Sequence, residues 1–237
     1  MGIMRKPIIV ITGASRGLGA AIAQHMAGVG AHVVLMARSL EWLERVDDAI
    51  QNTGGTATLV PCDLKDGDKI DALGVALMEK YGKVDGIVCN AAILGKLTPL
   101  THLAPKQWQE MMEVNCTAHW RLLRILHPLL ACATSPHVLG ITCHDAHMPE
   151  SFWGGYRISK VAFEMLMRSY AHEVAHTAIK VNLLALPPME TALRAQAFPS
   201  EDRARICKPH DPRILALVEK MLGATYEAHD ERVEFIP

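Results

Sequence analysis

Short apolar runs alternate along the chain with longer segments in which apolar residues recur at helical spacing. The runs have strand length and are apolar on both faces, which is typical of strands covered by helices on both sides. Candidate strands lie at 7–12, 31–37, 57–62, 85–90, 137–142 and 179–185, and the ending at 233–236 could supply a seventh. The intervening segments predict helices at 17–28, 40–52, 66–81, 105–132 and 156–175.

This strict alternation of strand and helix predicts an α/β fold, a parallel sheet of about seven strands with helices on both faces. We find no internal repeat, low-complexity tract or linker, so we expect residues 1–237 to form a single domain. The segment after Pro187 is rich in proline and lacks a strand pattern. It predicts an excursion over the mouth of the sheet, a substrate lid at about 187–210.

The composition of the chain indicates its partners and its cellular compartment. The formal net charge of −1 gives no electrostatic reason to expect nucleic acid or an anionic membrane as a partner. The first apolar run is only about five residues, too short for a signal peptide, and no run approaches the ~20 residues that span a bilayer. The six cysteines are scattered without a CxxC pair, as buried thiols of cytosolic proteins are. We expect a cytoplasmic protein.

Three glycines, Gly13, Gly17 and Gly19, follow the first predicted strand and open the first predicted helix. The strand-to-helix turn needs a residue without a Cβ, and the close approach of a pyrophosphate to the backbone needs another. The helix N-terminus adds free N–H groups and a partial positive charge. The pattern predicts a dinucleotide site, and a tight turn without a ligand is the alternative.

The end of the second predicted strand indicates which dinucleotide binds. Ala37 and Arg38 stand where an acidic residue would hold the ribose hydroxyls of NAD, and Arg16 in the glycine loop adds a second cation. Guanidinium groups match phosphate oxygens in bidentate geometry, so the pair favours the 2′-phosphate of NADP(H) over NAD. The alternative is that both arginines are solvated surface residues.

Tyr156 and Lys160 are four residues apart in "YRISK" and so share one helix face. A free phenol has a pKa of about 10, and a neighbouring ammonium group favours the phenolate. Tyr156 could therefore give a proton to a carbonyl or take one from an alcohol. Taken alone, the pair could equally be ordinary surface neighbours.

Five motifs in order make the chain resemble the classical short-chain dehydrogenase/reductase family over essentially its whole length. They are "TGASRGLG", "CDL" at 62–64, "CNAA" at 89–92, "VNCT" at 114–117 and "YRISK" at 156–160. The resemblance implies a Rossmann-type doubly wound sheet and dimers or tetramers built on helices 105–132 and 156–175. The stretch "TALRAQAFPSED" is further similar to a group of poorly characterised bacterial oxidoreductases.

The resemblance also implies roles for single residues. Asn115, Tyr156 and Lys160 would be three members of the catalytic tetrad, with Lys160 also bonding the nicotinamide ribose and Asn115 holding a water that links Lys160 to solvent. Asp63 and Leu64 would lie against the adenine. The remaining cofactor residues would be Gly13, Ser15, Arg16, Gly17, Leu18, Gly19, Arg38, Asn90, Ala91 and Thr191.

Three positions depart from the family pattern. Cys143 stands thirteen residues before Tyr156, where the family has a serine, and a thiol is a weaker hydrogen-bond donor than a hydroxyl. Thr142 is adjacent, but neighbouring strand residues face opposite sides, so we do not expect it to substitute. Ala92 replaces a glycine, and "LPP" at 186–188 replaces a proline-glycine.

Two functions remain open on these residues. One is an NADP(H)-dependent oxidoreductase that interconverts a carbonyl and an alcohol on a small apolar substrate. The other is an NADP(H)-binding redox sensor or interaction protein with weak or no catalysis, because Cys143 replaces the serine. Retention of Asn115, Tyr156 and Lys160 favours the enzyme. A pocket for a bulky guest is suggested by His147, Met148, Phe152, Trp153 and Met189.

The run "HDAH" at 144–147 invites two further interpretations. It could bind a metal, but no other ligand set has metal-like spacing, so we predict no metal site. Cys143 and His144 could form a hydrolase pair, but adjacent residues rarely achieve nucleophile–base geometry, and no nucleophile elbow is present.

Overall fold

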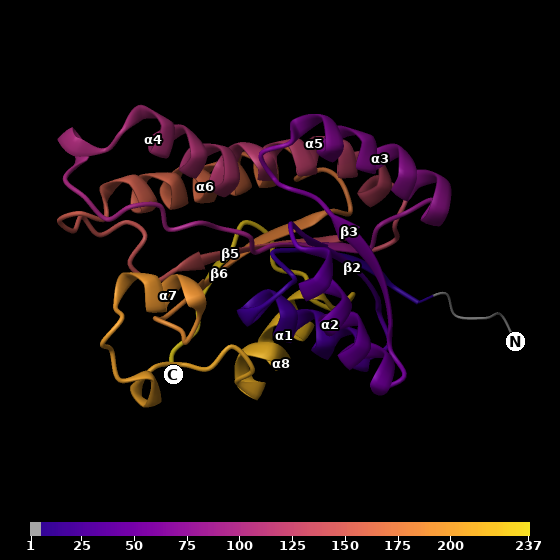
Figure 1. The fold of residues 1–237 in the computed structure, drawn as a ribbon. Helices are drawn as coiled ribbons and strands as arrows, with labels where there is room; N and C mark the ends of the chain where they lie inside the picture. The colour runs from indigo at the N-terminus through magenta and orange to yellow at the C-terminus, as the bar shows by residue number, and fades with distance from the viewer. Residues whose placement is uncertain (1–5) are drawn as a thin grey trace, which may run out of the picture.

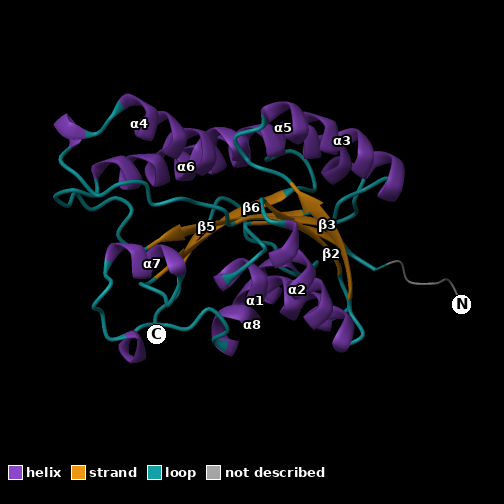
Figure 2. Ribbon diagram, in the orientation of Figure 1, coloured by secondary structure: helices purple, strands orange, loops and turns teal. Residues whose placement is uncertain are grey.

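The computed structural model describes residues 6–237, and its seven strands form one parallel sheet in the order β3-β2-β1-β4-β5-β6-β7 (Figures 1 and 2). The predicted α/β fold is confirmed, and residues 1–5 of the predicted domain lie outside the described residues. Most strand ends differ from the prediction by a single residue. The strands are β1 (Ile8–Thr12), β2 (His32–Ala37), β3 (Thr56–Pro61), β4 (Gly86–Cys89), β5 (His137–Cys143), β6 (Lys180–Leu186) and β7 (Arg232–Glu234).

Helices cover both faces of the sheet (Figure 1). One layer holds α1 (Gly17–Gly28), α2 (Leu40–Asn52) and α8 (Pro212–Leu222). The opposite layer holds α3 (Gly67–Tyr81), α4 (Pro105–Met112), α5 (Ala118–Ala131) and α6 (Gly154–Glu173). Each layer buries its own apolar cluster against the sheet, which explains why the strands are apolar on both faces.

The helix predicted at 105–132 is interrupted. A π-helical turn at Glu113–Thr117 separates α4 from α5. A π turn inserts an extra residue into a helix and re-aims the side chains within it. Here it contains Asn115, whose buried side chain reaches two neighbouring segments. Helical periodicity cannot show such an insertion, because the apolar stripe resumes after it.

The segment after Pro187 contains short helices and no strand until β7. It holds α7 (Ala192–Ala197) and a 3₁₀ turn at Arg203–Arg205 before the chain enters α8, and another 3₁₀ turn lies at Leu100–His102 after β4. Helix α8 was not predicted, although Asp211 caps its N-terminus and Pro212 occupies the first turn. Its buried residues recur at helical spacing, at Ile214, Leu215, Val218, Met221 and Leu222. The excursion over the sheet therefore ends near residue 211.

The strand order places a crevice at the centre of the sheet. The first strand, β1, pairs with β2 on one side and with β4 on the other. The strand order therefore runs outward from β1 to β3 on one side and from β4 to β7 on the other. In such sheets the crevice at the carboxyl ends of the strands is the usual ligand site. Figure 1 shows α7 at this end of β5 and β6. Within residues 6–237, no helix is long and apolar enough to cross a membrane.

Candidate active site

The glycine loop adopts backbone conformations that require glycine. Gly13 and Gly17 have φ of 67° and 58°, in the left-handed region. A Cβ on Gly19 would lie 2.3 Å from the carbonyl oxygen of Gly13 and 2.7 Å from Nδ2 of Asn90. Arg16 precedes α1 in an extended conformation and its side chain makes no capping bond, so the first N–H groups of α1 stay available to a ligand.

The loop after β4 is locked to the end of β1 by Thr12. Its Oγ1 accepts hydrogen bonds from the backbone N–H groups of Asn90 (2.9 Å) and Ala91 (3.0 Å), and donates to the carbonyl of Val88 (3.2 Å). Asn90 Nδ2 donates back to the Thr12 carbonyl at 2.9 Å. The sequence analysis did not single out Thr12, which fixes two predicted cofactor residues from beneath.

The Asn115 side chain joins two segments of the site. Its Oδ1 accepts from the Ile93 N–H at 2.8 Å, while Nδ2 donates to the Ile93 carbonyl (2.9 Å) and to Ser159 Oγ (2.8 Å). Ser159 in turn donates to the carbonyl of Tyr156 at 2.6 Å. Both amide hydrogens are thus used within the protein, so this side chain has no donor left for the predicted water.

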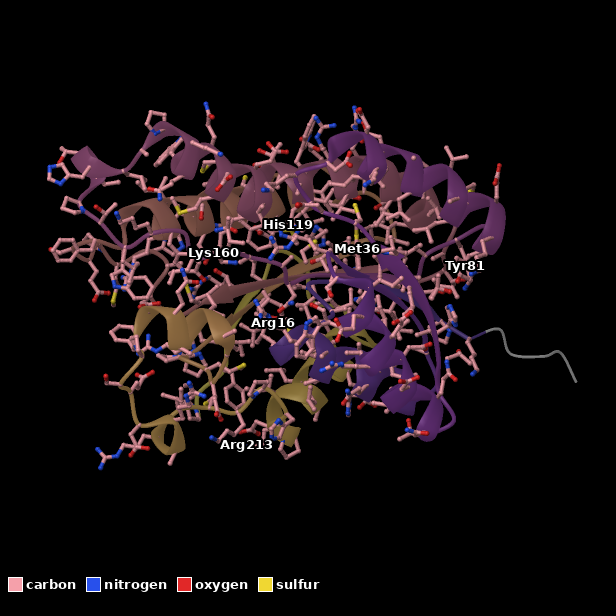
Figure 3. All side chains as sticks on the ribbon, viewed as in Figure 1. Arg16, Met36, Tyr81, His119, Lys160 and Arg213 are labelled. Carbon is pink, nitrogen blue, oxygen red and sulfur yellow. The ribbon has the colours of Figure 1, made fainter. Side chains whose placement is uncertain are left out.

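Lys160 is buried beside β5. Its Nζ donates to the Ile141 carbonyl at 2.8 Å and lies 4.6 Å from the centroid of the Phe163 ring. His119 packs on the same ring and donates from Nε2 to the Ala91 carbonyl at 3.0 Å; Figure 3 shows it near Lys160. Burial lowers the pKa of Lys160 and lowers that of His119 to about 4.

Tyr156 and Cys143 line the same cavity as Lys160. Burial is the main influence on both, and it raises the pKa of the Tyr156 phenol and that of the Cys143 thiol, the latter to about 11. The expectation that the Lys160 ammonium brings the phenol pKa down is therefore not met by these side chains alone. Additional positive charge beside Tyr156 is needed to oppose the effect of burial.

One cavity of about 590 Å³ collects these features at the carboxyl ends of the strands. Every predicted catalytic or cofactor residue lines it except Asn115, which stands behind it. Arg16 and Arg38 are exposed at one end, and neither forms an ion pair within residues 6–237. Cys143, Tyr156 and Lys160 line the other end, so the cavity has an end with two guanidinium groups and an end with thiol, phenol and ammonium groups.

Known proteins with similar sequences identify the family. The short chain dehydrogenase family matches residues 7–202 of this sequence. The chain belongs to the short-chain dehydrogenase family. The uncharacterized oxidoreductase YciK of Escherichia coli K12 is 31% identical over 239 residues, which cover 97% of this chain and 94% of YciK. The resemblance predicted from the motifs, including the one to poorly characterised bacterial oxidoreductases, is thereby confirmed, and this chain is an oxidoreductase of the short-chain type.

Solved structures show the same architecture. A short chain dehydrogenase from Escherichia coli CFT073, complexed with NADPH, superposes with a TM-score of 0.92 at 29% identity, covering 99% of this chain and 98% of its own. One from Shigella flexneri 2a strain 301, complexed with NADP, superposes with a TM-score of 0.91 at 29% identity, covering 98% of each chain. The Rossmann-type fold of this short-chain dehydrogenase is therefore shared along almost its full length.

In this short-chain dehydrogenase, the Thr142 hydroxyl is engaged within the protein. It donates to Glu164 Oε1 at 2.6 Å, and the residue is buried. That Thr142 does not substitute for the serine stays a prediction. Cys143 and His144 form no hydrogen bond with each other in the described part of the chain, so the geometry gives no support to a hydrolase pair.

The "HDAH" side chains point to separate partners. The carboxylate of Asp145 pairs with Arg157 Nη2 at 2.7 Å, His147 Nε2 bonds Glu164 at 2.7 Å, and Nε2 of His144 is buried without a partner in residues 6–237. No group of three or more His, Cys, Asp or Glu in that range is arranged to hold a metal ion.

The excursion after β6 lies against two loops of the short-chain dehydrogenase. Gln196 in α7 donates from Nε2 to the carbonyl of Gly95 at 3.1 Å, beyond β4. Phe198 stacks on Trp153 in the loop after β5, with ring centroids 5.7 Å apart. Arg194 lies 3.8 Å from the Phe198 ring centroid. The excursion therefore bridges the loops at the mouth of the cavity.

Only part of the predicted substrate wall lines the cavity. Trp153 and Met189 do, whereas Met148 and Phe152 are exposed and His147 turns to Glu164. Some polar residues with partners distant in the chain were not predicted from the sequence. These are His119, Glu164 and Arg232, and no local pattern marks them.

Proposed function

We propose that this short-chain dehydrogenase uses NADP(H) to interconvert a carbonyl and an alcohol, with Tyr156 as the proton donor and acceptor. The observation that carries the proposal is that one cavity joins the glycine loop, the Tyr156–Lys160 pair and two arginines that form no ion pair within residues 6–237. The NADP and NADPH complexes of the two similar structures support the choice of cofactor.

The cofactor fits the residues at each end of the cavity. The N–H groups at the start of α1 would bind the pyrophosphate, and Gly19 leaves the space that the adjacent backbone needs. Arg16 and Arg38 would bind the 2′-phosphate. Asp63 and Leu64 would lie along the adenine. The nicotinamide half of the cofactor would contact four other lining residues, Asn90, Ala91, Lys160 and Thr191.

The chain's own residues would manage the proton. The nicotinamide supplies the hydride when bound. Tyr156 would donate its phenolic proton to the carbonyl oxygen as that oxygen gains negative charge, and would recover it in the reverse direction. Buried Lys160 would stabilise the phenolate formed, and Cys143 would offer a weak S–H donor to the same oxygen. Added positive charge from an oxidised nicotinamide would oppose the burial that raises the pKa of Tyr156.

The end of the cavity with the phenol group is the proposed substrate end, and it favours small, largely apolar substrates. Trp153 and Met189 contribute apolar surface there. The guanidinium of Arg157 is held by the carboxylates of Asp145 and Glu150, so it is not free to bind an anionic substrate.

We also propose the domain organisation, the cellular location and the assembly of the chain. The chain would work as one domain with residues 187–210 as its lid, in the cytoplasm. It would assemble as a dimer or tetramer through the outer surface of α4–α6, where Trp108, Trp120 and Met165 are exposed. Light scattering of the purified protein tests the assembly, and a monomer at micromolar concentration would contradict it.

A second candidate is an NADP(H)-binding sensor with little catalysis, which the weak Cys143 donor favours. Mixing the protein with NADPH and a panel of uncharged ketones, aldehydes and quinones separates the two. Loss of NADPH absorbance with at least one compound supports the reductase. Tight NADPH binding without oxidation by any compound supports the sensor, and absence of NADPH binding contradicts both.

A further inference from the structure

Glu164 is a buried carboxylate that lies outside the cavity. It stands on α6 one turn beyond Lys160, and only 2% of its surface is exposed. Its oxygens accept hydrogen bonds from Thr142 Oγ1 (2.6 Å), His147 Nε2 (2.7 Å) and Arg232 Nε (3.1 Å). Burial alone would raise the pKa of Glu164, but these partners outweigh burial and lower it. The carboxylate is therefore ionised at neutral pH and fully partnered.

Arg232 carries the connection from Glu164 to the substrate end. It is the first residue of β7 and pairs with Leu183 of β6. While Nε bonds Glu164, Nη2 donates to the carbonyls of Cys143 (3.1 Å) and His144 (3.3 Å). A planar guanidinium holds its N–H donors in a fixed fork, so one side chain can bond the carboxylate and the carbonyls together. A side chain from β7 thus holds the backbone of Cys143 in place.

These contacts fix four consecutive residues at the end of β5. Lys160 bonds the Ile141 carbonyl, Glu164 bonds Thr142, and Arg232 bonds the carbonyls of residues 143 and 144. The helix that carries Tyr156 is therefore joined to the strand that carries Cys143 by two direct hydrogen bonds and, through Arg232, by a partly buried ion pair. An S–H group is a weak and directional donor, so its contribution depends closely on its position.

We propose that Glu164 and Arg232 are positioning residues that set Cys143 against Tyr156, so that both reach the same substrate oxygen. Neither side chain lines the cavity, so both act through the end of β5. The inference rests on the proposed carbonyl chemistry for its effect on turnover, but the positioning of Cys143 can be measured without turnover.

The kinetic test uses Glu164→Gln, which removes the charge and keeps the shape. We expect kcat to fall about three- to tenfold, the contribution of one hydrogen bond to the substrate oxygen, while the Kd for NADPH stays unchanged. The matched control is Arg168→Gln on the same helix, which breaks an exposed ion pair with Asp230 and should leave kcat unchanged. Equal losses of kcat in the two variants would overturn the proposal.

A double-mutant cycle tests whether Glu164 acts through the thiol. In a Cys143→Ala background, Glu164→Gln should lower kcat by less than about twofold, because the group being positioned is gone. Arg232→Lys, which keeps the charge but loses the fork, should reproduce most of the Glu164→Gln loss. A full additional loss in the Cys143→Ala background would show a general structural role and contradict the proposal.

Alkylation by N-ethylmaleimide, followed residue by residue with mass spectrometry, gives the readout that needs no substrate. Cys143 is partly buried, whereas Cys132 is exposed and serves as an internal reference. We expect Cys143 to react about tenfold faster relative to Cys132 in Glu164→Gln and at the original rate in Arg168→Gln. An unchanged rate in Glu164→Gln overturns the positioning role. If no carbonyl compound is reduced but this rate rises, the proposed function fails and the positioning role stands.

Discussion

The two ends of the cavity are built in different ways. At the cofactor end, the critical contacts are backbone contacts between neighbouring segments: the glycine turn, the N-terminus of α1 and the loop held by Thr12. At the substrate end, long side chains such as Lys160 and Arg232 cross between elements that are distant in sequence. We therefore expect substitutions at the substrate end to lower kcat while leaving the Kd for NADPH unchanged.

The largest expected effect on kcat is at Tyr156, at the substrate end. Tyr156→Phe removes the phenolic proton, so we expect kcat to fall about 10²- to 10⁴-fold while the Kd for NADPH changes less than about twofold. Tyr170→Phe is the matched control, since Tyr170 lies on the same helix and its hydroxyl bonds His127. Retention of kcat in Tyr156→Phe would remove the proton-transfer role.

A pH effect on stability should arise at the cofactor end. Burial lowers the pKa of His119 to about 4, against 6.5 when exposed. The unfolded chain therefore binds a proton at pH values where the folded protein does not. The contribution of His119 is complete above about pH 6.5 and falls as the pH drops toward 4, by about 3 kcal/mol of unfolding free energy.

Denaturant unfolding of wild type and His119→Leu between pH 7 and 4 measures this contribution. The variant should show a smaller loss of unfolding free energy over that interval. His102→Gln, at an exposed position, is the control and should follow the wild type. Parallel curves for wild type and His119→Leu would show that His119 does not titrate as expected.

Arg38 tests the cofactor end through affinity. Arg38→Ala should weaken NADPH binding about ten- to a hundredfold, the value of charge-assisted bonds to a phosphate, and leave NADH binding unchanged. Fluorescence titration measures both constants, and Arg205→Ala, an exposed arginine that pairs with Asp202, is the control. Equal weakening of both cofactors would contradict recognition of the 2′-phosphate.

The smallest expected effect is at Cys143. Cys143→Ser restores a hydroxyl donor at the substrate oxygen, so we expect kcat for carbonyl reduction to rise about tenfold with the same Kd for NADPH. Steady-state kinetics with a reduced compound from the panel measures it. A fall in kcat would show that the thiol has a role that a hydroxyl cannot fill.

Sequence reasoning succeeded where the chemistry is local. The strands, the glycine turn and the Tyr156–Lys160 spacing each depend on residues close together in the chain. It failed where a partner comes from far away. The hydrogen bonds of the Asn115 side chain to Ile93 and Ser159, and the burial that raises the pKa of Tyr156, come from segments distant in the chain. The omission of α8 has another cause, because its capping signals are local and were overlooked.

The alternation of strands and helices, the glycine loop and the family could be inferred from the amino-acid sequence, because periodicity and short motifs encode them directly. Which side chains meet at the end of β5 depends on the folded chain. Glu164 and Arg232 are 68 residues apart, and Arg232 and Cys143 are 89 apart. Contacts between residues so far apart in the chain form because β7 returns to the sheet beside β6 after α8. No local pattern of residues predicts that placement.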